Sequence, residues 1–108
     1  MTIADFADAV FASAHRSAIC ETATIVRYVG PSIKLRIDLY VGGFVEAYFN
    51  PESGNISYAL IRDEERVYAV DNAGGWHYHP VGLPEMHVPL AFPVSFDEFL
   101  HEVERIQP

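Results

Sequence analysis

Segments at both ends of the chain carry apolar residues at helical spacing. In the first, from Ile3 to Ile19, the recurring residues are Ile3, Phe6, Ala7, Val10, Phe11 and Ala14. Thr2 is a suitable N-cap, and Asp5 lies in the first turn, where the helix dipole favours a carboxylate. In the second, Ser95 and Glu98 match a capping box that precedes an apolar stripe of Phe96, Phe99, Leu100, Val103 and Ile106. We therefore predict two helices that cover a sheet and expose their charged faces.

The central part of the chain is rich in Val, Ile, Tyr and Phe, and short turn sequences interrupt it regularly. The pattern predicts strands near residues 22–29, 33–41, 44–49, 55–62 and 66–71. Because all the turns are short, consecutive strands should pair antiparallel as a meander. In the second strand, alternation places Leu35, Ile37, Leu39 and Val41 on one face and Arg36, Asp38 and Tyr40 on the other. One sheet face should therefore pack against helices, and the other should face water or a ligand.

These elements predict an α+β fold: an antiparallel meander of about five strands with an N-terminal and a C-terminal helix packed on it. The 108 residues suffice for a single domain, residues 1–108, and half of them are hydrophobic. Asp5 and Asp8 do not fit a secretory leader, and no apolar run has the length of a membrane span. With Cys20 as the only cysteine, we expect a cytoplasmic protein without a disulfide.

The net charge restricts the partners. Seven Lys and Arg against fifteen Asp and Glu give a formal charge of −8. Tight nucleic-acid binders usually present a basic patch, because the release of counterions from phosphates drives binding. The candidate patch here is Arg27, Lys34 and Arg36, which a hairpin at Gly30-Pro31 would bring onto neighbouring strands. We therefore expect RNA as a substrate at most, and not as a tight ligand.

Between the last predicted strand and the C-terminal helix lies a Pro-, Gly- and His-rich loop, residues 72–94. It contains four of the seven prolines, three of the seven glycines, three of the five histidines and the only Trp. The prolines exclude a long helix and disfavour a regular central strand. A segment of this length without regular structure is often functional. His15 and His101 fall on the predicted helices instead, and we interpret them as surface or packing residues.

The loop histidines suit two kinds of chemistry. In extended backbone His77 and His79 share one face, with Trp76 and Tyr78 on the other, and His87 can fold back after a Gly-Leu-Pro bend. His77 and His79 with a third ligand, one of His87, Asp71 or Glu85, would form a site for a divalent metal such as zinc. Without a metal, the same imidazoles can act as general acid and base on a phosphodiester. Packing of the rings without chemistry remains the simplest interpretation.

Neighbouring residues fit a site around these histidines. Asp71 can orient an imidazole or ligate a metal where the last strand ends, although an Asp-Asn pair also suits a turn. Trp76 and Tyr78 are candidates for stacking on a base, or for anchoring the loop to the core. With Asn72 and Arg62 they complete the residues that we assign to substrate binding.

The chain resembles the TumE-like family of toxin components. The resemblance rests on the run from Asn55 to Arg62, on Val67-Tyr-Ala-Val-Asp71-Asn72 with the histidine-rich loop after it, and on Pro93-Val-Ser95 before a Glu-rich helix. It covers most of the chain after about residue 40. The matching site residues are Asp71, Asn72, His77, His79 and His87. Family members often carry adjacent histidines here, whereas this chain has a spaced pair after Gly74-Gly75-Trp76.

The resemblance implies a small α+β protein that inhibits growth, works in the cytoplasm and pairs with a small cognate antitoxin. By analogy with other toxins it implies a ribonuclease-like or phosphodiesterase-type hydrolase, with His77, His79 and His87 as working residues and Asp71 orienting them. The alternative is a non-catalytic interaction domain whose histidine loop is structural or binds a metal. We expect the antitoxin to be basic, since acidic surfaces attract complementary ones. Exposed edge strands are also compatible with a homodimer.

Overall fold

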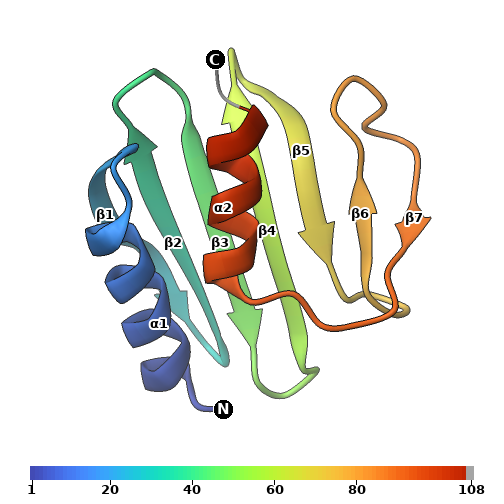
Figure 1. The fold of residues 1–108 in the computed structure, drawn as a ribbon. Helices are drawn as coiled ribbons and strands as arrows, with labels where there is room; N and C mark the ends of the chain where they lie inside the picture. Colours follow the sequence, from blue (N-terminus) through green and yellow to red (C-terminus); the bar gives the residue numbers. More distant parts are fainter. Residues whose placement is uncertain (107–108) are drawn as a thin grey trace.

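The computed structural model describes residues 1–106, which form two helices and seven strands (Figure 1). Helix α1 spans Ile3–Arg16, and helix α2 spans Phe96–Ile106. The strands are β1 (Cys20–Val29), β2 (Ser32–Leu39), β3 (Phe44–Asn50), β4 (Asn55–Arg62), β5 (Glu65–Asp71), β6 (His77–His79) and β7 (Val88–Pro89). All belong to one sheet whose spatial order equals the sequence order, and every neighbouring pair is antiparallel. The predicted α+β meander with a helix near each end is confirmed.

The sheet has seven strands, so the expectation of about five was too low. The two additional strands, β6 and β7, lie inside the segment expected to be an irregular loop. They are three and two residues long, and Pro80 follows β6 directly. Pro89 lies in β7, the last strand of the sheet, where a missing N–H donor costs no ladder bond. Short strands between prolines leave too few residues for the alternation of apolar and polar positions that reveals a strand in a sequence.

Both helices begin with the expected capping groups. The Oγ1 of Thr2 accepts from the Asp5 N–H at 3.1 Å, and the Thr2 N–H donates to the Asp5 carboxylate at 3.0 Å. Ser95 and Glu98 form the same reciprocal pair, at 3.1 and 2.9 Å. These hydrogen bonds hold the pKa of both carboxyls below its usual value. Helix α1 ends at Arg16, before the predicted Ile19, because Ser17 takes an extended conformation that leads into β1.

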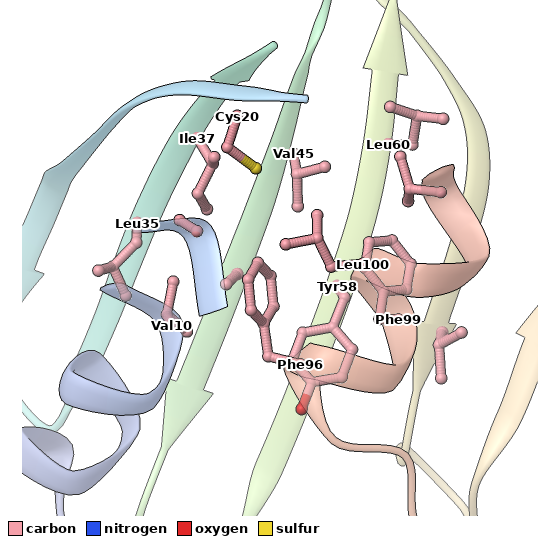
Figure 2. Close-up of a cluster of buried hydrophobic side chains, with 14 of the residues drawn as sticks. Val10, Cys20, Leu35, Ile37, Val45, Tyr58, Leu60, Phe96, Phe99 and Leu100 are labelled. Atoms are coloured by element: carbon pink, nitrogen blue, oxygen red, sulfur yellow. The ribbon is translucent and has the colours of Figure 1, made fainter. Parts of the chain in front are cut away.

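The core lies between one face of the sheet and the two helices, which pack side by side on that face (Figures 1 and 2). Helix α1 contacts β1, β2 and β3, whereas α2 covers β4. Leu35, Ile37 and Leu39 of β2 point into this core as predicted. Val41 does not, because β2 ends at Leu39 and the following turn leaves Val41 56% exposed. No helix among residues 1–106 is both long and apolar enough to cross a membrane.

The opposite, helix-free face of the sheet carries the cations that were candidates for a basic patch. Arg27 lies across from Lys34 in the β1–β2 hairpin, as expected. Acidic partners offset the positive charge, since Lys34 lies 3.8 Å from Glu46 and Arg36 lies 2.9 Å from Asp38. These strands therefore present mixed charge, in agreement with the expectation that tight nucleic-acid binding is disfavoured.

Candidate functional site

The sheet register brings Asp71, His77 and His79 together. Asp71 is the last residue of β5, and it lies directly across from His77 in β6. Because side chains alternate along a strand, His77 and His79 share one face, and Tyr78 between them points to the other. The histidines lie on the helix-free face, because Tyr78 pairs with the buried Val70 and packs against the core. The predicted shared face of His77 and His79 is confirmed.

A return loop from Pro80 to His87 brings the third histidine to this pair. Two tight turns shape it, with Leu83 N–H donating to Pro80 O at 3.1 Å and Met86 N–H donating to Leu83 O at 3.0 Å. The ring centroid of His87 then lies 4.8 Å from that of His77 and 4.4 Å from that of His79. One ligand atom from each of the three rings lies within 4.8 Å of the others. The loop therefore converts three separated histidines into one cluster.

Asp71 places a single oxygen against two imidazoles. Its Oδ1 accepts a hydrogen bond from the Ala73 N–H at 3.0 Å, which fixes the carboxylate at the end of the strand. Its Oδ2 lies 3.2 Å from Nε2 of His77 and 3.3 Å from Nε2 of His79. The three side chains are 20%, 12% and 5% exposed, respectively, so water screens these contacts weakly. We refer to Asp71, His77, His79 and His87 as the histidine cluster.

Backbone carbonyls hold the other ring nitrogens of the two buried histidines. Nδ1 of His77 donates to Gly75 O at 2.9 Å, and Nδ1 of His79 donates to Pro84 O at 3.0 Å. A carbonyl oxygen only accepts, so the Nδ1 proton is fixed in both rings and each Nε2 is directed at Asp71. This arrangement suits either acid–base chemistry or a bound metal ion.

An open pocket gives access to the cluster. It has a volume of about 440 Å³ and lies beside His77 and His87, with Trp76, Gly74, Gly75, Ala73, Pro89 and Leu90 as its other lining residues. His87 is exposed, whereas His79 is only 4% exposed. A molecule entering this pocket would meet His87 and His77 first, with the ring of Trp76 beside it.

Two of the predicted substrate-binding residues, Tyr78 and Arg62, lie away from the histidine pocket, and so does the candidate metal ligand Glu85. Tyr78 lines a different hollow of about 530 Å³ against α2, on the opposite face of the sheet. Arg62 ends β4 next to Glu65, whereas Asp71 pairs with Ser57 about 17 Å away, at roughly 3.3 Å per residue. In the described part of the chain Glu85 makes no contact with the cluster. Only Trp76 borders the histidine pocket as proposed.

Arg66 lies beside the histidine cluster, and the sequence did not reveal this position. Its Nη2 donates to Pro84 O at 2.9 Å and lies 3.3 Å from Nδ1 of His79. Both nitrogens donate to the same carbonyl, so the short distance between them reflects this shared acceptor. Arg66 thereby fastens the return loop and places a positive charge next to His79. Its sequence context is an ordinary strand start, so only the folded loop gives it this role.

Asn72 has a structural role in the sheet. Its Oδ1 accepts from the Ile56 N–H at 2.8 Å, and its Nδ2 donates to Gly54 O at 2.9 Å. The side chain thus continues the β4–β5 pairing after β5 has ended, next to Asp71. The sequence had offered a turn or a substrate contact at this position.

Replacing Asn72 with Ala should lower the free energy of unfolding by about 1–3 kcal/mol, because the part-buried Ile56 N–H of β4 and the Gly54 carbonyl before β4 lose their partners. Urea denaturation followed by circular dichroism measures this change. Asn55→Ala is the matched control, since no side-chain hydrogen bond of Asn55 is found within residues 1–106, and it should change stability by less than about 0.5 kcal/mol. Equal effects of the two substitutions would contradict the structural role of Asn72.

Comparisons with known proteins add no information about the role of the histidine cluster. No protein-family model, no curated protein and no solved structure matches the chain significantly.

Proposed function

We propose that the chain is the toxin component of a toxin–antitoxin pair, resembling the TumE-like family, and that its histidine cluster hydrolyses a phosphodiester of RNA in the cytoplasm. One observation carries the proposal: three imidazoles and a carboxylate converge beside an open pocket. Imidazole and carboxylate side chains gathered in this way can take up, release and orient protons of a bound substrate. Buried packing of histidines without chemistry needs no adjoining pocket.

The positions of the side chains suggest which role each residue of the histidine cluster has in the proposed cleavage. His87 is exposed and borders the pocket together with His77, so these two rings are the ones that reach a substrate. In RNA cleavage His87 would take the proton of the 2′-hydroxyl and pass it to the leaving 5′-oxygen, because both ring nitrogens of His77 already have protein partners. Asp71 orients His77 and His79 through Oδ2, and Arg66 supplies positive charge near His79.

The charge distribution supports turnover of RNA without tight binding. The chain carries a net charge of −8, and acidic side chains accompany Lys34 and Arg36 on the helix-free face. Binding driven by counterion release is weak on such a surface. We expect the Michaelis constant to be high and cleavage to depend only weakly on salt concentration.

The same charge favours a basic antitoxin as the partner. We assign it to strand β1, which is the longer of the two edge strands of the sheet and is exposed on both faces along its outer half, with Ile25, Val26, Tyr28 and Val29 at least 50% exposed. Size-exclusion chromatography with light scattering should find the isolated chain to be a monomer. A stable dimer would instead assign this edge to a second copy.

Induced expression in a bacterial host tests the proposed function. The wild-type chain and His101→Ala should arrest growth, whereas His87→Ala and His79→Ala should not. His101 lies on α2 with its side chain 69% exposed, so its substitution controls for loss of a histidine as such. His87 is exposed, so its substitution removes a cluster member without opening a cavity in the core. Circular dichroism and immunoblotting confirm that all four proteins are folded and equally abundant.

The proposal fails if folded wild-type protein neither arrests growth nor cleaves total cellular RNA. Arrest by all four proteins would keep a toxin but separate it from the histidine cluster.

A non-catalytic interaction domain is the second candidate, and the burial of His79 favours it. Both ring nitrogens of His79 have protein partners and the side chain is 5% exposed, as is usual for a structural site. This candidate predicts that substitutions in the cluster reduce stability and leave growth unaffected.

A further inference from the structure

We propose that the histidine cluster binds one zinc ion, with Nε2 of His77, Nε2 of His79 and Oδ2 of Asp71 as fixed ligands and the ring of His87 as an adjustable fourth ligand. This inference rests on the proposed function only for the use of the ion in hydrolysis. Binding of the ion is independent of any activity.

The first argument is the direction of the hydrogen bonds. The Nδ1 atoms of His77 and His79 carry protons, because each faces a carbonyl oxygen. In the neutral rings each Nε2 is then an acceptor. Both nevertheless point at the same carboxylate oxygen, at 3.2 and 3.3 Å. Three electron-rich atoms therefore converge with no proton between them, which is unfavourable unless a cation lies at their centre.

The second argument is the separation of these atoms. Zinc bonds of about 2.0–2.2 Å at tetrahedral angles place neighbouring ligand atoms about 3.3–3.5 Å apart. The Nε2–Oδ2 distances of 3.2 and 3.3 Å match one edge each of such a tetrahedron. The ligand atoms of the three rings lie within 4.8 Å of one another. A small rotation of the exposed His87 ring would therefore bring its nitrogen to the fourth corner of the tetrahedron.

The third argument is the support around the ligands. Metal-binding histidines commonly donate their second ring N–H to a backbone carbonyl or carboxylate, which fixes the tautomer and the ring orientation. His77 and His79 both do so, through Gly75 O and Pro84 O. Asp71 is likewise fixed through Oδ1 by the Ala73 N–H. The protein thus orients three ligands before any ion arrives.

Protonation of Nε2 in both His77 and His79 would satisfy these atoms less well than a metal ion. Placing one on each Nε2 would create two imidazolium rings with centroids 5.1 Å apart, beside Arg66 and against a single carboxylate. Like charges at this separation repel strongly in a poorly solvated site. One divalent ion bound to all the acceptors satisfies them without placing charge on the rings.

The donor set selects the class of ion. Three imidazoles and one carboxylate suit zinc and similar transition metals, whereas magnesium and calcium require mostly oxygen ligands. His87 borders the pocket, so its displacement opens a coordination position on the accessible side. An open position is what distinguishes catalytic from structural zinc sites, and an ion held by these residues would supply Lewis-acid activation of water for hydrolysis.

The test uses purified full-length protein that has been treated with EDTA and dialysed. Isothermal titration with ZnCl₂ should show one ion per chain. At a hundredfold excess over the dissociation constant, ZnCl₂ should raise the thermal midpoint by about 10 °C or more. MgCl₂ at the same concentration should change neither measurement.

Three single-histidine variants test the assignment of ligands. His79→Ala should abolish stoichiometric binding. His87→Ala should weaken it about 10–100-fold, since the three fixed ligands remain. His101→Ala should leave it unchanged. Because His87 is exposed, its variant stays folded even if His79→Ala does not.

Lack of stoichiometric zinc binding by the wild type would overturn the proposal. So would equal affinity of His87→Ala and His101→Ala, because surface histidines would then account for the signal. These readouts are independent of growth arrest, so failure of zinc binding and failure of the toxin proposal are distinguishable.

Discussion

Truncation of Phe99 to Ala should lower the free energy of unfolding by about 3–5 kcal/mol. Phe99 is 1% exposed at the centre of the layer between α2 and the sheet (Figure 2). Its ring stacks on Tyr68 at 5.5 Å with an interplanar angle of 11°, and it packs against Tyr58 at 5.3 Å. The substitution removes these contacts and leaves a cavity that rigid β4 and β5 cannot fill.

This loss is a large share of the free energy of unfolding of a typical domain, which is about 5–15 kcal/mol. Urea denaturation followed by circular dichroism provides the measurement. Phe92→Ala is the matched control, because Phe92 is 78% exposed and the same atoms are removed. Its effect should remain within about 0.5 kcal/mol. Similar losses for the two variants would mean that α2 does not pack on the sheet as described.

Replacing Gly43 with Ala should lower the free energy of unfolding by about 2–4 kcal/mol. Gly43 turns the chain from β2 into β3 with a φ of +75°, in the left-handed region that L-residues avoid. A Cβ there would lie 2.5 Å from the backbone oxygen of Ile61 and 2.9 Å from Cγ of Arg62. The added atom must push β4 away from β3, because the nearest atom belongs to the backbone and cannot rotate aside.

Gly42→Ala separates the clash from the conformational strain. Gly42 also has a positive φ, +102°, but nothing lies within 4 Å of its added Cβ. It should cost only the strain, about 1–2 kcal/mol. The thermal midpoints of both variants, measured under identical conditions, give the comparison. A Gly42 variant as unstable as the Gly43 variant would show that close approach of β4 does not matter.

Most of the fold could be predicted from the periodic spacing of apolar and polar residues. Strands β3 and β4 lie within a residue of their predicted limits, the capping box predicted at Ser95 forms, and the predicted N-cap Thr2 forms a second one with Asp5. Long alternating runs succeed because a half-buried strand must repeat every two residues. Strands β6 and β7 escaped notice because three residues next to Pro80, and two ending in Pro89, carry no such repeat.

Only part of the histidine cluster could be predicted from the sequence. His77 and His79 share a face by simple alternation, and Asp71 reaches them because β5 ends opposite β6. The depth of the site and the position of Arg66 depend on the return loop, whose path follows from two turns and a carbonyl of Pro84. Arg62 and Tyr78 were plausible by residue type alone. Side-chain chemistry does not reveal which end or which face of a strand a residue occupies.

The spatial order of the strands equals their order in the sequence, and all four residues of the histidine cluster fall within the segment from Asp71 to His87. Closing this segment therefore needs only one hairpin and one short loop, which is the kind of local contact that forms early in folding. During synthesis the segment leaves the ribosome before α2 does, so the cluster can assemble while the core is still open on one side. An ion captured at that stage would act as a nucleus for the last three strands, and its supply would then influence the yield of folded protein.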